Sequence, residues 1–150
     1  MKKLALILLP VLLLFSVTAC SRQSKVLSSI GKYESEQIWT HGKFQDYTDF
    51  GIYTFSSANI SDNEYFSAIG DDATQTINAF LDDFENLVAT FRDNDPNDDL
   101  ALNYSFDRSI IDSEDYFYLY EDESYPKYGC YDLWIFDTQT NQLYYFHNNI

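Results

Sequence analysis

Two histidines, His41 and His147, are the first residues to consider for chemistry, because histidine serves both in metal binding and in acid-base catalysis. They are far apart in the sequence, and together with a nearby aspartate they would form a zinc site. Nothing in their spacing requires them to meet, so we favour two histidines at strand ends that bond to backbone groups or water. The chain has no G-x-S-x-G, H-E-x-x-H or C-x-x-C motif and no Gly-rich phosphate loop. The sequence therefore predicts no catalytic residue and no cofactor.

An acidic run in the middle of the chain has part of the ligand spacing of a calcium loop. Asp93, Asp95 and Asn97 occupy the first, third and fifth positions of an EF-hand-like loop. The sixth position is Asp98, where the sharp turn needs Gly, and the twelfth is Tyr104, where a bidentate Glu would complete the ligands. A weak calcium site is one interpretation. We favour a solvated loop that ends a helix.

Aromatic residues are the most unusual part of the composition, with 13 Tyr, 12 Phe and 2 Trp. Over residues 116–120, strand alternation sends three tyrosines to one face and Phe117 with Leu119 to the other. In a hairpin near the C-terminus, a register that pairs Trp134 with Tyr145 puts those two on one face as well. The sequence therefore predicts a sheet with aromatic side chains on both faces.

The sheet face turned away from the helix predicted below is the candidate recognition surface. Tyr and Trp offer large, rigid contact area with a polar tip, which suits binding of protein or sugar. The alternative is that the N-terminal strands and loops cover this face and that its aromatics are simply core and sheet surface. The candidate residues are Tyr116, Tyr118, Tyr120, Trp134 and Tyr145.

Cys20 follows a segment with the layout of a signal peptide, namely a basic start, an apolar run over residues 4–15 and a small residue, Ala19, before a cleavage point. The apolar run is shorter than the roughly 20 residues that span a bilayer. Residues 17–20 resemble the lipobox of bacterial lipoproteins, although Val17 stands where that family usually has Leu. The resemblance implies that residues 1–19 are removed, that the Cys20 thiol carries a diacylglycerol, and that the protein is anchored outside the cytoplasmic membrane.

An ordinary secretory cleavage after Ala19 is the alternative, and it would leave Cys20 free to pair with Cys130. We favour lipidation, because it accounts for a cysteine placed directly after the cleavage site. Cys130 is then the one thiol left in the mature chain. We expect it to be a small buried hydrophobe and not a nucleophile.

Charge divides the mature chain into two parts. Residues 20–32 are Ser-rich with three basic residues and no acidic one, which predicts a flexible basic tether. Residues 33–150 hold four basic residues and all 24 acidic ones, a net charge of -20. Such a domain is a poor nucleic-acid binder, because Lys and Arg supply affinity for phosphates. An acidic body is also repelled by anionic lipid, so we expect the domain to stand off the membrane.

One amphipathic helix and several strands are expected in the single domain over 33–150. Asp72 with Gln75 resembles a capping box, and the helix is expected to end before Pro96. Strands are expected over 37–41, 51–55, 116–121, 131–137 and 143–147, the last two as a hairpin. This order predicts an α+β domain with the helix packed on an antiparallel sheet of about five strands. The helical stripe consists of Ile77, Phe80, Leu81, Phe84, Leu87, Val88 and Phe91.

The function expected from the sequence is that of a membrane-anchored extracytoplasmic lipoprotein with a small acidic binding domain. Residues 144–150 also resemble small uncharacterised surface lipoproteins of Gram-positive bacteria, which implies no activity. We expect a monomer whose partner, a protein or a glycan, is unknown. An immunity-type or inhibitor protein that neutralises a basic toxin or enzyme is the alternative. An uncharacterised hydrolase is a third and weaker one.

Overall fold

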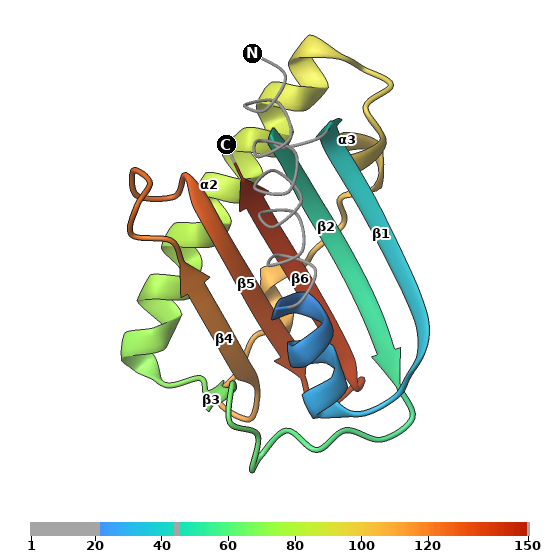
Figure 1. The fold of residues 1–150 in the computed structure, drawn as a ribbon, viewed down its shortest axis with the longest axis vertical. Coiled ribbons are helices and arrows are strands. Elements are labelled where there is room, and N and C mark those ends of the chain that lie inside the picture. Colours follow the sequence, from blue (N-terminus) through green and yellow to red (C-terminus); the bar gives the residue numbers. More distant parts are fainter. Residues whose placement is uncertain (1–21, 44–45, 150) are drawn as a thin grey trace, which may run out of the picture.

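Six antiparallel strands form one sheet in the order β1-β2-β6-β5-β4-β3 (Figure 1). The computed structural model describes residues 22–43 and 46–149, so the predicted signal peptide and the predicted lipidation site, Cys20, lie outside the described residues. Together with the helices, the sheet confirms the α+β prediction, with one short strand more than expected. The strands are β1 (Tyr33–Lys43), β2 (Asp46–Phe55), β3 (Ser67–Ala68), β4 (Tyr116–Glu121), β5 (Cys130–Asp137) and β6 (Gln142–Asn149).

The hairpin of β5 and β6 has the predicted register, with Trp134 opposite Tyr145. Its turn is held by Asp137, whose Oδ1 accepts the N–H groups of Gln139 at 2.8 Å and Thr140 at 3.2 Å. Asn141 adopts a positive φ of 53°, a conformation that Asn tolerates better than most residues. Local turn chemistry therefore fixes which face each later side chain occupies.

Helix α2 (Asp71–Asn94) covers one face of the sheet and buries five of the seven residues of the predicted stripe, while Leu87 and Phe91 are half-buried. The capping box is wrong: Gly70 is the N-cap and makes no side-chain cap, while Asp72 lies inside the first turn. Acidic residues there still suit the positive end of the helix dipole. The helix ends before Pro96 as predicted, and the N–H of Asp95 bonds to Phe91 O at 2.8 Å.

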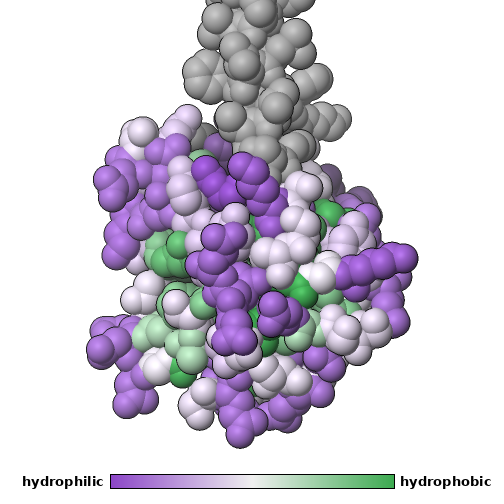
Figure 2. Space-filling view, turned by 60° about the horizontal axis from the view of Figure 1, so that its bottom comes forward, coloured by the Kyte–Doolittle hydropathy of each residue, from purple (hydrophilic) through white to green (hydrophobic). Residues whose placement is uncertain are grey.

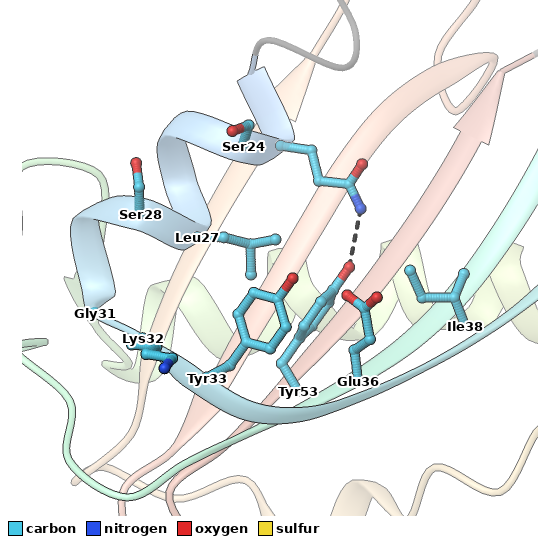
Figure 3. A pocket seen from close by; sticks show the side chains of 10 residues that line it. Ser24, Leu27, Ser28, Gly31, Lys32, Tyr33, Glu36, Ile38 and Tyr53 are labelled. Atoms are coloured by element: carbon cyan, nitrogen blue, oxygen red, sulfur yellow. Dashed lines mark hydrogen bonds between the residues drawn. The ribbon is translucent and has the colours of Figure 1, made fainter.

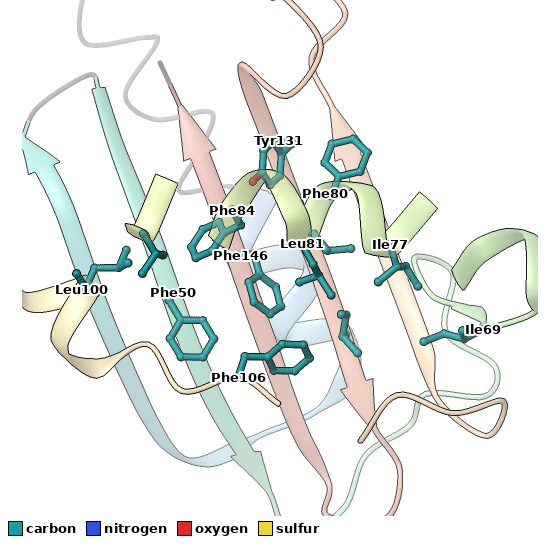
Figure 4. Close-up of a cluster of buried hydrophobic side chains, with 14 residues drawn as sticks. Phe50, Ile69, Ile77, Phe80, Leu81, Phe84, Leu100, Phe106, Tyr131 and Phe146 are labelled. Atoms are coloured by element: carbon teal, nitrogen blue, oxygen red, sulfur yellow. The ribbon is translucent and has the colours of Figure 1, made fainter. Parts of the chain in front are cut away.

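The core between α2 and the sheet is largely aromatic (Figure 4). Phe146 is at its centre, with ring centroids 5.3 Å from Phe84 and 5.5 Å from Phe50. The short helices α3 (Asp99–Asn103) and η1 (Arg108–Ile110) extend this layer, and Leu100 of α3 is fully buried in it. We call this side of the sheet the α2 face.

A helix over residues 22–30 packs on the opposite face, in front of the sheet in Figure 1. The tether predicted for residues 20–32 is therefore wrong over this stretch, and the folded body extends back at least to Arg22. Val26, Leu27 and Ile30 are the reason, because together they form a short apolar stripe that is buried against the sheet. Of the helices in the described ranges, none is long and apolar enough to cross a membrane.

Candidate functional site

An open groove of about 720 Å³ lies between helix 22–30 and strands β1 and β2 (Figure 3). Its apolar part comes from the helix and from both strands, and its polar part is mostly hydroxyl and amide groups. Figure 3 shows Leu27 pointing from the helix toward the rings of Tyr33 and Tyr53. The lining residues are Gln23, Ser24, Leu27, Ser28, Gly31, Lys32, Tyr33, Glu36, Ile38 and Tyr53.

Tyr53 is the fixed floor of the groove. It is fully buried, its hydroxyl accepts a hydrogen bond from Gln23 Nε2 at 2.9 Å, and Tyr33 packs edge-on at 5.3 Å. Burial raises the pKa of Tyr53, so its hydroxyl stays neutral. The described lining residues include one carboxylate, Glu36, and one ammonium, Lys32, with no histidine or cysteine. These groups suit binding better than acid-base catalysis.

A second polar group sits on the same face, centred on the carboxylate of Asp132. Its Oδ1 accepts the hydroxyl of Tyr145 at 2.9 Å and lies 2.7 Å from His147 Nδ1. Its Oδ2 lies 3.3 Å from the guanidinium of Arg22, which stacks over the ring of Tyr120. Burial favours the neutral acid, yet the bonds from His147 and Tyr145 and the charge of Arg22 lower the pKa of Asp132. We call these residues the Asp132 cluster; it latches helix 22–30 to β5.

The two histidines do not meet. His41 pairs in register with Thr48 and His147 with Asp49, so they project from opposite faces of the sheet. His41 stacks on Phe91 at 3.5 Å and has Nδ1 2.6 Å from an oxygen of Asp98. The zinc pair is therefore excluded, and each histidine has a carboxylate partner instead of the solvent or backbone partner that we favoured.

The acidic run forms turns and caps. Asp95 accepts the N–H of Asn97 at 2.9 Å, and Asp98 accepts the N–H of Ala101 as the N-cap of α3. Asp93 belongs to the last turn of α2. Within the described residues, no group of three or more His, Cys, Asp or Glu is arranged to hold a metal ion. Weak calcium binding by Asp93, Asp95 and Asn97 stays the less favoured of the two interpretations.

The candidate recognition surface is wrong at its centre. Trp134 and Tyr145 stack at 4.0 Å on the predicted face, but they are 0% and 3% exposed because helix 22–30 covers them. Tyr116, Tyr118 and Tyr120 share that face and are half-buried. Figure 2, which brings the lower end of Figure 1 forward, shows hydrophobic patches separated by hydrophilic residues. The alternative of a covered face is correct, although helix 22–30 forms the cover together with the loop that carries Ile60 and Phe66.

Within the described residues Cys130 is a free thiol, and it is half-buried where we expected it to be buried. Burial, followed by the negative charges of Asp122 and Asp132, raises its pKa. A thiol that is harder to ionise is a weaker nucleophile, in line with the structural role expected for it.

Comparison with known proteins adds no relative: no family model, no curated protein and no solved structure matches this chain. The groove residues were missed by sequence reasoning, because six of the ten belong to the segment interpreted as a tether. The available signal was the spacing of Val26, Leu27 and Ile30, which falls on one side of a helix.

Proposed function

We propose that this protein is a membrane-anchored extracytoplasmic lipoprotein whose acidic domain binds a partner in the groove between helix 22–30 and β1. The observation that carries the binding role is the groove itself, with a fixed apolar floor and a polar rim. Its described lining has no histidine or cysteine, so we propose binding and no reaction. The anchor is supported by the lipobox-like sequence that ends at Cys20.

The anchor and the groove are close neighbours in the chain. Arg22 follows Cys20 by two residues, which an extended chain spans in at most about 7 Å. A lipid on Cys20 would therefore hold the folded body close to the membrane and not at the end of a tether. Lys25 and Lys32 add attraction to anionic lipid of about 1 kcal/mol per charge near the surface, whereas the charge of Arg22 is paired with Asp132.

A second candidate function, inhibition of a basic toxin or enzyme, is favoured by the way basic side chains are used. Arg108 pairs with Asp82 and Glu85 at 2.8 Å, and Arg92 bonds to the carbonyl of Ala101. These contacts leave a large acidic surplus on the rest of the domain. A surplus of this kind attracts a basic protein over long range and speeds its association.

The anchor is tested by processing in a bacterial host. The wild-type chain is expected in the membrane fraction, with a mass that corresponds to cleavage before Cys20 and addition of lipid. Cys20→Ser is expected to stay uncleaved or to become soluble. An unmodified wild-type N-terminus joined to Cys130 by a disulfide would contradict the anchor.

The binding role is tested by photo-crosslinking in producing cells. A photoreactive residue replaces Ser28, which is exposed at the groove, or Glu123, which is exposed in the turn between β4 and β5. A discrete adduct is expected from position 28 and none from position 123. Equal adducts from both positions, or none from either, would argue against a partner in the groove.

A further inference from the structure

The two edges of the sheet differ in how well they are protected. One edge is β3, with two residues, and the other is β1, with eleven. An edge strand has unpaired N–H and C=O groups, which proteins guard with short strands, bulges, Lys or Pro. β1 has an irregularity between Tyr33 and Ser35, but residues 35–41 pair regularly with β2 and contain no Lys or Pro. Within the described residues, no strand pairs with the outer edge of β1, so its middle is a template for another strand.

The side chains beside this edge have a distinct pattern. Glu36 and Ile38 lie on the groove side of β1, opposite Tyr53 and Gly51 of β2. Ile38 is 40% exposed and is one of few large hydrophobic residues exposed in the described part of the chain. A strand added to β1 would place neighbouring side chains against a carboxylate and an apolar contact, two residues apart on one face.

We infer that β1 accepts an extended, basic segment of a partner protein as a seventh strand of the sheet. The inference rests on the proposed binding role and names its partner class. Backbone hydrogen bonds to β1 supply affinity, and the groove selects side chains. A Lys or Arg of the segment lies beside Glu36, and an apolar side chain lies beside Ile38 and above the groove floor.

Charge selects a basic partner over a second copy of this chain. Two copies of β1 paired edge to edge would bring Glu34 and Glu36 of each copy close together, and like charges on neighbouring strands are destabilising. Each domain also has a net charge of -20 over residues 33–150. The same charges attract a cationic segment.

The probe is a fluorescein-labelled peptide, Thr-Lys-Thr-Val-Thr-Lys-Thr-Val-Thr, in which Lys and Val alternate on one strand face. It is titrated with the chain as processed by a bacterial host and purified in detergent, and anisotropy reports binding. We expect a Kd below about 100 µM, weakened by added salt. The peptide with Glu in place of Lys is expected not to bind. No binding of the Lys peptide at about 1 mM protein would overturn the inference.

Backbone pairing is tested with two N-methylated forms of the peptide. Each form carries methyl groups on alternate amides, so each blocks hydrogen bonding along one of the two edges of the peptide strand. Only one edge can face β1, so one form is expected to bind at least tenfold more weakly and the other about as well as the parent. Equal binding of both forms would mean that charge alone holds the peptide, and it would overturn strand addition.

Two protein variants locate the contact. Glu36→Lys is expected to weaken binding at least tenfold, whereas the matched control Glu123→Lys changes the same charge elsewhere and is expected to weaken it less than about twofold. Ile38→Thr keeps a strand-forming residue and removes the apolar contact, so an intermediate loss is expected. Equal losses in Glu36→Lys and Glu123→Lys would overturn the inference. So would a dimer in sedimentation that Ile38→Thr dissociates.

Failure of this inference is distinguishable from failure of the proposed function. If position 28 gives a discrete adduct in cells while the Lys peptide does not bind, the groove has a partner that does not add a strand. If position 28 gives no adduct and the peptide still binds at β1, the edge of β1 can accept a strand, but the proposed binding role of the groove in cells fails.

Discussion

The two faces of the sheet are closed in different ways. Over the α2 face lies a helix of 24 residues, whose stripe meets a dense aromatic layer around Phe146. Over the opposite face lie the helix at 22–30 and the loop that carries Ile60 and Phe66. On that side the helix is also tied to the sheet by the ion pair of Arg22 with Asp132. The α2 face thus has a large apolar cover, whereas the opposite face has a small apolar cover that the Asp132 cluster helps to hold in place.

The difference indicates which side opens first. Local opening is easiest where few apolar contacts must be broken. Helix 22–30 contributes three buried apolar residues, Val26, Leu27 and Ile30, whereas α2 contributes five. The groove, the open edge of β1 and the segment after Cys20 all belong to the side with the smaller cover. The proposed binding and the proposed anchoring would therefore act on the less stable half of the molecule.

Trp134→Ala is expected to have the largest effect on the free energy of unfolding. It tests whether helix 22–30 and the sheet enclose a packed core. Trp134 is fully buried between Tyr53 and Tyr145, and truncation of a buried Trp costs about 3–5 kcal/mol. Urea unfolding measures the loss. Leu102→Ala is the control, since Leu102 is 64% exposed and its truncation should change stability by no more than about 0.5 kcal/mol. A loss below about 1 kcal/mol for Trp134→Ala would mean that helix 22–30 leaves this face open.

Ile30→Ala tests the cover from the helix side. Ile30 is 2% exposed, and removal of a buried Ile side chain to Ala costs about 2–5 kcal/mol. Hydrogen exchange sharpens the comparison: amides of helix 22–30 should exchange faster in Ile30→Ala while those of α2 keep their protection. Ser28→Ala, at an exposed position of the same helix, should alter neither measurement. Equal acceleration in both helices would show that the two covers unfold as one unit.

The parts predicted from sequence are those set by local patterns. The stripe of α2 repeats over several turns, and the turn after Asp137 fixes the hairpin, so both are read from neighbouring residues. The helix at 22–30 could not be predicted with the same ease, because its three apolar residues stabilise it only when they find the far sheet face. Its serines fit a tether equally well, and Ser28 and Ser29 bond to helix carbonyls here.

Part of the Asp132 cluster could have been predicted from the sequence. The predicted register pairs Trp134 with Tyr145. Two residues further from the turn on each strand, the same register pairs Asp132 with His147. Counting along the hairpin would have given this buried pair. The contact with Arg22 could not be obtained in this way, since it depends on where helix 22–30 docks.

Asp132→Asn tests the polar latch and has a pH signature. The pKa of Asp132 is lowered in the folded protein: burial opposes this shift, but the bonds from His147 and Tyr145 and the charge of Arg22 outweigh it. A lowered pKa means that the carboxylate stabilises the fold above pH about 4 and that this contribution is lost as the pH falls further. We expect Asp132→Asn to cost about 1–3 kcal/mol at pH 7, and progressively less below pH 4, in urea unfolding.

Glu123→Gln is the control for this loss, because it removes one negative charge from an exposed turn and should stay within about 0.5 kcal/mol of wild type. If Asp132→Asn lowers the free energy of unfolding equally at pH 7 and pH 3.5, the stabilisation by the Asp132 cluster comes from neutral hydrogen bonds. The charged contact with Arg22 would then contribute nothing to holding helix 22–30.

Asp49→Asn is expected to give the smallest change in stability, and this change is a gain where the other substitutions give a loss. Asp49 lies on the same face, opposite His147 in the β2–β6 register, and burial raises its pKa although Thr40 donates a hydrogen bond to it at 2.6 Å. A raised pKa means that the charged form is disfavoured in the folded state, so this penalty applies at neutral pH and fades as the pH falls toward 4. Asn keeps an acceptor for Thr40 and removes the charge, so a gain below about 1 kcal/mol is expected at pH 7 and none near pH 4. Asp62→Asn, at an exposed site, should give no such pH-dependent gain. Destabilisation by Asp49→Asn at pH 7 would mean that the Asp49 charge supports His147, so that the latch includes two carboxylates and not one.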